Sequence, residues 1–183
     1  MLYLVSSSSS RATLLENAGI AFTQIQFDFD ENLEKNIPAN AYVQRVVLEK
    51  EKQFCAKLDK EFEDKTLLFA DSIVCAKNQI LTKAKSKEEA YKMLALQSNE
   101  NASILSAFVL KSPQKKVFSL SKTTLFFKEF QSKDLENYVE NGLYEGKAGA
   151  IMCEGFHKKY IIKQLGNLST ALGLDTLTLK AYL

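Results

Sequence analysis

Hydrophobic positions along the chain follow two spacings, and the switches between them divide the sequence into short strands and helices. Leu2 to Val5 form a short apolar run that predicts a buried strand, and residues 22–29 alternate as a half-exposed strand does. Residues 39–58, after Pro38, repeat apolar side chains every three or four positions, which predicts a long amphipathic helix. Strand and helix patterns in alternation favour an α/β fold with a mixed sheet.

The rest of the chain continues in the same way. Residues 66–74 (TLLFADSIV) form a near-continuous apolar strand, which Lys77-Asn78 could turn back on itself. Ser86 and Glu89 make a capping box that opens a helix ending near Gln97. The other expected elements are strands at 102–111 and 116–130, a helix near 132–141 and a short helix at the end of the chain.

Composition narrows the class of protein. Of 183 residues, 46% are apolar and 25% charged, as in ordinary globular proteins. Lysine and arginine (24) nearly cancel aspartate and glutamate (22), which argues against a nucleic-acid or membrane-surface partner. No apolar run approaches the ~20 residues of a membrane span. Three scattered cysteines without a pairing motif fit a reducing cytoplasm. With no repeat and no long linker, residues 1–183 are predicted to form a single domain.

Five consecutive serines, Ser6 to Ser10, separate the first strand from a helix predicted at 11–18. Serine runs are typical of flexible linkers, yet this one is flanked within one residue by a strand and a helix. A strand, a tight polar loop and a helix N-terminus present N–H groups and hydroxyls to an anion, and Arg11 in the first turn could clamp a phosphate. The same serines also suit a plain helix N-cap, and the pattern alone leaves both interpretations open.

Acidic residues lie within or at the end of two of the predicted strands. Asp71 stands in an apolar strand, where a carboxylate costs free energy unless it is paired, metal-bound or at a cleft. The cluster Asp28 to Glu31 lies at the end of the strand at 22–29 and, taken alone, favours a solvated loop over a metal site. Brought together, these carboxylates and the serine loop could hold Mg²⁺ or Mn²⁺ with a phosphate substrate.

Histidine chemistry is not indicated by this sequence. His157 is the single histidine of the chain, so a structural zinc site or a histidine-based catalytic triad is not expected. The residue lies in GFHKKY, which is predicted to start a basic strand, and it is expected to be exposed or hydrogen-bonded.

Several short motifs in order resemble the Maf family, small cytoplasmic nucleoside triphosphate pyrophosphatases also described as septum-formation proteins. They are LVSSSSSRATLL, DFDE, LEKE, FADSIV, ILTKA, GKAGAIMCEG and LGLDTL, and the likeness extends over nearly the whole chain. The departures mark a divergent member: Ser9 stands for a proline, Ser10 for the first of two arginines, and Ala84 and Asp175 for prolines.

The resemblance implies a fold and an activity. The fold would be α/β, with a mixed, strongly curved sheet, flanking helices and two lobes around a cleft, as in the inosine triphosphate pyrophosphatases. The activity would be metal-dependent hydrolysis of the α–β phosphate bond of non-standard, modified or pyrimidine nucleoside triphosphates. The products are the nucleoside monophosphate and pyrophosphate, a house-cleaning role in the nucleotide pool. Family members are often homodimers.

The resemblance also implies roles for individual residues. Asp71 would deprotonate the attacking water and touch the metal, Mg²⁺ or Mn²⁺, which Glu31 would also bind. The phosphate-binding residues would be Ser6, Ser8, Arg11, Lys50 and Lys83. The alternative to an enzyme is a non-catalytic regulator of cell division that binds nucleotide or protein. The nucleobase is left open between uridine or thymidine and methylated guanosine, with Glu154 standing where the pyrimidine branch has glutamine.

Overall fold

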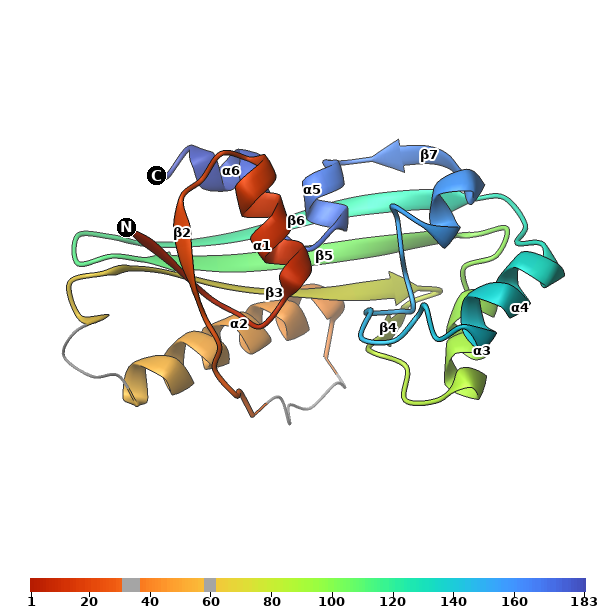
Figure 1. The fold of residues 1–183 in the computed structure, drawn as a ribbon, viewed down its shortest axis with the longest axis horizontal. Coiled ribbons are helices and arrows are strands. Elements are labelled where there is room, and N and C mark those ends of the chain that lie inside the picture. The colour runs from red at the N-terminus through yellow and green to blue at the C-terminus, as the bar shows by residue number, and fades with distance from the viewer. Residues whose placement is uncertain (31–36, 58–61) are drawn as a thin grey trace. The chain divides into compact units, whose positions relative to one another are not determined.

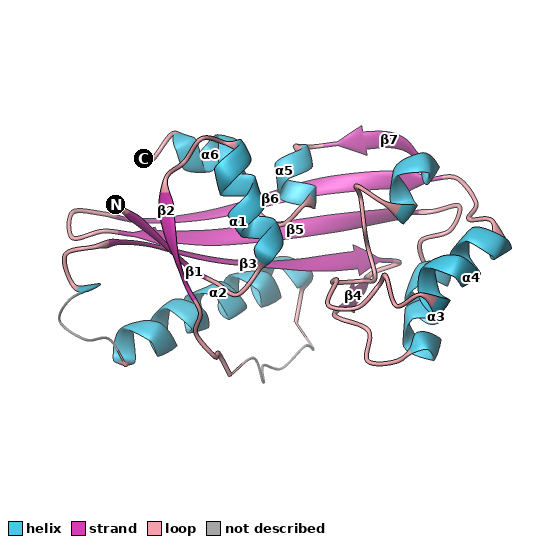
Figure 2. Ribbon diagram, viewed as in Figure 1, coloured by secondary structure: helices cyan, strands magenta, loops and turns pink. Residues whose placement is uncertain are grey.

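A computed structural model describes residues 1–30, 37–57 and 62–183. Strands and helices alternate along the first half of the chain, as the hydrophobic spacing predicts (Figures 1 and 2). In chain order the elements are β1 (Leu2–Val5), α1 (Ser9–Asn17), β2 (Phe22–Ile25), α2 (Ala39–Ala56), β3 (Thr66–Ala76), β4 (Gln79–Leu81), α3 (Lys87–Ala95), β5 (Asn101–Lys111), β6 (Lys116–Phe127), α4 (Ser132–Glu140), the 3₁₀ helix η2 (Phe156–Tyr160), β7 (Ile161–Leu165), α5 (Leu168–Ala171) and α6 (Thr176–Lys180).

The chain divides into two compact units, which we describe separately. Unit 1 comprises Met1–Ser72, Ser106–Ser121 and Leu172–Leu183, and unit 2 comprises Ile73–Leu105 and Lys122–Ala171. Strands β3, β5 and β6 contribute residues to both units. The single domain predicted for residues 1–183 and the cleft between its lobes stay predictions.

The strands form a mixed sheet, which confirms the expected α/β class. Their order is β2-β1-β3-β5-β6-β7, with β4 paired to β3. Strand β1 runs parallel to both β2 and β3, whereas β6 and β7 are antiparallel. Within unit 1, α1 lies between the parallel strands β1 and β2 in the chain, because a parallel connection needs a crossover segment.

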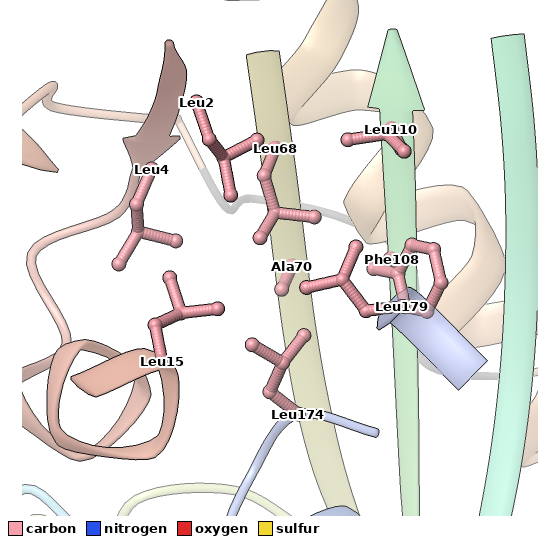
Figure 3. Packing of buried hydrophobic residues seen from close by; sticks show 9 residues of the cluster. All are labelled: Leu2, Leu4, Leu15, Leu68, Ala70, Phe108, Leu110, Leu174 and Leu179. Atoms are coloured by element: carbon pink, nitrogen blue, oxygen red, sulfur yellow. The ribbon is translucent and has the colours of Figure 1, made fainter. Parts of the chain in front are cut away.

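The core of unit 1 determines which way the side chains of β3 point. Leu68 and Ala70 face the cluster shown in Figure 3, where Leu15 of α1 packs close to Leu4 of β1. Phe69 points to the opposite face of the strand and contacts Phe54 of α2, with ring centroids 5.6 Å apart. Side chains of β3 therefore alternate between the α1 side and the α2 side of the sheet.

Local signals placed most element boundaries correctly. Ser86 caps α3 by accepting a hydrogen bond from the Glu89 N–H at 3.2 Å, which confirms the serine half of the predicted capping box, whereas the Glu89 carboxylate accepts from the Lys85 N–H at 2.7 Å. Lys77 and Asn78 have positive φ angles of 46° and 62° and connect β3 to β4, which confirms the predicted turn. Helix α1 starts at Ser9 rather than Arg11, because Ser8 is its N-cap.

Three predicted strands differ from the observed ones. Strand β2 ends at Ile25, four residues before the predicted end, and β6 ends at Phe127, three residues early. The strand predicted to start at GFHKKY begins only at Ile161, as β7, because residues 156–160 form the 3₁₀ helix η2. Residues 162–165 are all exposed, so no alternation marks this strand in the sequence. No helix among the described residues is long and apolar enough to cross a membrane.

His157 is a buried polar residue of unit 2. The side chain is fully buried and not exposed. It is hydrogen-bonded, which is the other possibility that the sequence leaves open. Its Nδ1 accepts from the Met152 N–H at 3.0 Å, and its Nε2 lies 3.2 Å from Oε1 of Gln97. Since Nδ1 is the acceptor, the ring proton belongs on Nε2, where it is donated to Gln97. Phe127 and Phe130 pack edge-on against the ring.

This burial predicts that acid destabilises unit 2. Burial lowers the pKa of His157 from 6.5 to about 3, so the folded protein keeps the ring neutral while the unfolded chain protonates it. The stability that the neutral ring contributes is complete above pH 6.5 and is lost progressively as the pH falls from 6.5 toward 3, by up to ~1.4 kcal/mol per pH unit.

Urea unfolding at several pH values between about 7 and about 5.5 measures this loss. His157→Gln, which cannot titrate, is expected to be less stable than the parent at neutral pH but to show a flatter pH dependence. Because His157 is the only histidine, no other side chain of ordinary pKa titrates in this range. Equal pH slopes for the two proteins would contradict the assignment.

Candidate active site

The serine loop holds Arg11 in a defined position. Ser8 caps α1 by accepting a hydrogen bond from the Arg11 N–H at 3.4 Å, and the Ser6 hydroxyl oxygen accepts one from Nη1 of Arg11 at 3.0 Å. The Ser8 N–H also donates to the Ser6 oxygen at 3.3 Å. The loop is therefore a helix cap, as one interpretation of the sequence proposed, and a cradle for the guanidinium at the same time. Its binding of phosphate stays a prediction.

Two further groups face the Arg11 guanidinium. Its Nε donates to the carbonyl oxygen of Gly173 at 3.1 Å, and its Nη2 lies 3.9 Å from Oδ1 of Asp71. Arg11 is only 9% exposed, so these contacts are shielded from solvent. A guanidinium held on several edges keeps one orientation, which suits a group that recognises a polyanion.

Lys50 comes to the site from the buried side of α2. Its position, four residues after Val46 and four before Phe54, places it on the apolar stripe of the helix. Its Nζ lies 2.7 Å from Oδ1 of Asp71 and 5.4 Å from the centre of the Phe29 ring. A lysine that is 8% exposed needs such a counter-charge.

Asp71 is the centre of the cluster. The alternation of β3 places it on the same side as Phe69, toward α2, where Lys50 meets it. Its side chain is 16% exposed and lies beside two cations, so Arg11, Lys50 and Asp71 together carry a net positive charge. Such a cluster attracts an anion while keeping a carboxylate next to it, as a base must be when it activates water at a phosphate.

The acidic motif after β2 is tied to the same helix. Gln53 of α2 accepts from the N–H of Asp30 and donates to its carbonyl oxygen, each at 2.9 Å. Gln53 and Lys50 lie three residues apart on α2, and therefore on neighbouring positions of its surface. Glu31, the predicted metal ligand, lies outside the described residues.

Lys83 is the predicted phosphate ligand that does not belong to unit 1. It belongs to unit 2, where it is exposed and forms an isolated β-bridge with Ala148. Its role as a phosphate ligand stays a prediction.

Sequence reasoning missed three groups that a chain of hydrogen bonds links to Arg11. They are the carbonyl of Gly173, the hydroxyl of Ser72, which donates to that carbonyl at 3.1 Å, and the hydroxyl of Ser106, 2.8 Å from that of Ser72. No spacing in the sequence could show these contacts, because they join the start, the middle and the end of the chain. For Lys50 a signal did exist, namely a lysine in the apolar stripe of a helix.

A cavity of about 650 Å³ lies in unit 2, lined by residues of α4 and η2 that include Asn137, Tyr138 and Phe156. None of the predicted site residues lines it. The candidate site therefore rests on the charged cluster of unit 1, where a buried lysine and arginine meet a carboxylate.

Comparison with known proteins identifies the family. The sequence profile described as "Maf-like protein" matches residues 1–183. A curated protein of Campylobacter jejuni (strain RM1221), named nucleoside triphosphate pyrophosphatase, is 65% identical over 183 residues and the full length of both chains. Proteins of the same name from a Nitratiruptor species and from Helicobacter pylori (strain J99) are 39% and 36% identical, covering 96% and 95% of this chain and 94% and 90% of their own. The solved structure of the Staphylococcus aureus Ham1 protein gives a TM-score of 0.46 at 15% identity, over 71% of each chain. The chain belongs to the Maf family.

Proposed function

We propose that this protein is a nucleoside triphosphate pyrophosphatase, which hydrolyses the bond between the α- and β-phosphates and releases a nucleoside monophosphate and pyrophosphate. The observation that carries the proposal is the Asp71 carboxylate held between the Lys50 ammonium and the Arg11 guanidinium. Full-length relatives bear the name of this activity, which supports the same conclusion. No feature of the described residues favours the alternative of a non-catalytic cell-division regulator.

The reaction needs three things that these residues can supply. The triphosphate and the pyrophosphate leaving group need neutralisation, which Arg11 and Lys50 provide together with hydroxyl donors from Ser6 and Ser8. The attacking water needs a base, and Asp71 accepts its proton. Phosphate oxygens compete for the Lys50 ammonium, so substrate binding weakens the 2.7 Å ion pair and makes the Asp71 carboxylate available to water.

A divalent metal fits the same carboxylate. No group of three or more aspartate, glutamate, histidine or cysteine side chains in the described part of the chain could hold an ion by itself. Mg²⁺, however, is commonly held by one or two carboxylates and the phosphates of its nucleotide, with water in the other positions. Asp71 fits that role in the described structure, with Glu31 as the second ligand by family resemblance. A bound ion would supply charge neutralisation at the phosphates.

Release of pyrophosphate from a nucleotide panel tests the function. With Mg²⁺ present, purified protein is expected to convert a nucleoside triphosphate into equimolar monophosphate and pyrophosphate, without inorganic phosphate as a first product. The panel includes UTP, dTTP, methylated GTP and inosine triphosphate, because the nucleobase is the open part of the proposal. Nucleotide binding without pyrophosphate from any of them would favour a regulator instead.

Two properties of the family enter as proposals in the same way. A homodimer is supported by family resemblance and by exposed apolar side chains around β7, including Ile162, Leu165 and Leu168, which light scattering can test. A cytoplasmic location is supported by three cysteines that form no disulfide, Cys55, Cys75 and Cys153.

A further inference from the structure

The carbonyl oxygen of Gly173 is the meeting point of two hydrogen bonds near the end of the chain. It accepts from Nε of Arg11 at 3.1 Å and from the Ser72 hydroxyl at 3.1 Å. A carbonyl oxygen has two lone pairs, so these donors can satisfy it fully. Gly173 has a φ angle of +115°, which glycine adopts readily and other residues do not, and this geometry aims the carbonyl at Arg11.

The hydroxyl protons along this chain of contacts have defined directions. Ser72 has a single hydroxyl proton, and donating it to Gly173 leaves its oxygen as an acceptor. The contact of 2.8 Å between the Ser72 and Ser106 hydroxyls is therefore donated by Ser106. Ser106 therefore donates to Ser72, and Ser72 donates to the Gly173 carbonyl. Arg11 donates to the same carbonyl oxygen.

The segment that carries Gly173 is anchored immediately after it. Leu174 is 1% exposed and packs in the core of unit 1 (Figure 3). Asp175 caps α6 by accepting from the Thr178 N–H at 3.1 Å, and it also accepts from the Ser121 hydroxyl at 2.5 Å. Family members have proline here, and the aspartate fixes the segment by hydrogen bonds instead. The Gly173 carbonyl is thus a rigid acceptor.

We propose that Ser72 is a positioning residue for Arg11: by holding the Gly173 carbonyl it fixes the Nε edge of the guanidinium, and so keeps Nη1 against the Ser6 hydroxyl and Nη2 beside Asp71 at the proposed phosphate site. The inference rests on the proposed function, because it concerns the same guanidinium. Arg11 has no neighbouring arginine to share this role, since Ser10 stands where, by the resemblance, family members have the first of two arginines. A planar guanidinium turned by a small angle loses the geometry that two-point binding of phosphate needs.

Ser72→Ala tests the inference, with Ser72→Thr and Ser103→Ala as matched variants. Ser72→Ala removes the donor to Gly173 and is expected to lower kcat/KM about 5–10-fold, the effect of one hydrogen bond of ~1 kcal/mol or a little more. Ser72→Thr keeps the hydroxyl and is expected to restore activity. Ser103→Ala removes a comparable hydroxyl pair on β5, with Thr124 at 2.9 Å, and is expected to leave kcat/KM unchanged.

The decisive readout is the same substitution in an Arg11→Lys background. Lysine has no Nε–H to be positioned by Gly173, so Ser72→Ala is expected to have an effect below about twofold there. A loss of the same size in both backgrounds would show a merely structural role and overturn the inference, as would a Ser72→Ala protein of parental kcat/KM. If Ser72→Ala does not fold, Ser72→Cys, with its weaker donor, carries the same comparison.

Calorimetric binding of tripolyphosphate separates this inference from the proposed function. If the parent protein releases no pyrophosphate from any nucleotide, the proposed function fails, but tripolyphosphate affinity still reports on Arg11. Weaker tripolyphosphate binding by Ser72→Ala, restored in Ser72→Thr, supports the positioning role. Unchanged affinity, or no binding by the parent, overturns it.

Discussion

Asp71→Asn is expected to remain folded and to bind nucleotide while losing at least ~10²-fold of its pyrophosphate release, the contribution typical of a general base. Asparagine keeps the size of the side chain and an oxygen that can accept a hydrogen bond from Lys50, but it cannot take a proton from water. Pyrophosphate release, nucleotide affinity and the unfolding midpoint, measured on this one variant, separate loss of chemistry from loss of structure.

A second aspartate provides the control. Asp134 in unit 2 is paired with Lys159 and accepts a hydrogen bond from Tyr160, so Asp134→Asn also removes an ion-paired carboxylate. It is expected to keep its turnover. A purely structural Asp71 would instead lose ~1–3 kcal/mol of stability with activity nearly intact. Turnover of Asp71→Asn within about threefold of the parent would be too small a loss for a base and would refute the catalytic role.

Removal of divalent metal is expected to abolish pyrophosphate release, and added Mg²⁺ or Mn²⁺ to restore it. The reason is the ligand chemistry, since a carboxylate and phosphate oxygens select hard, oxygen-preferring ions. Turnover is measured in excess chelator, then after titration with Mg²⁺, Mn²⁺ and Zn²⁺. The unfolding midpoint is measured with and without chelator, so that an effect on folding is recognised.

Undiminished turnover in excess chelator would exclude the metal-assisted scheme. Stimulation by Zn²⁺ together with thiol sensitivity would point to the cysteines instead. That outcome is not expected for Cys153, because burial raises the pKa of its thiol to about 12 and keeps it protonated.

The parts of the fold that the sequence predicts are those with local causes. The N-cap at Ser86, the turn at Lys77-Asn78 and strand β1 each follow from residues within a few positions of one another. Strand β7 has no such cause. Its four exposed positions carry no alternation, and it is a strand because β6 offers its edge to pair with.

In the candidate site, too, contacts that leave a signal in the sequence can be predicted and the others cannot. The pairing of Lys50 with Asp71 spans 21 residues. A lysine in the apolar stripe of a helix indicates such a partner, because a buried lysine needs a counter-charge. The contact of Arg11 with Gly173 spans 162 residues and involves a backbone oxygen, which leaves no trace in side-chain spacing. Family resemblance selects the charged residues, and only the structure shows what holds them in place.

The Gln97 and His157 network has a consequence for how this protein could evolve. Gln97 donates to the carbonyl of Gly149 at 2.7 Å, and Tyr138 donates to that of Ala150 at 2.9 Å. His157 accepts a hydrogen bond from the Met152 N–H. Three side chains from outside residues 149–152 therefore hold the backbone of that segment. The exposed Glu154, where family branches differ, makes none of these bonds. A substitution at position 154 can therefore change the side chain exposed there without removing any of the hydrogen bonds that hold residues 149–152.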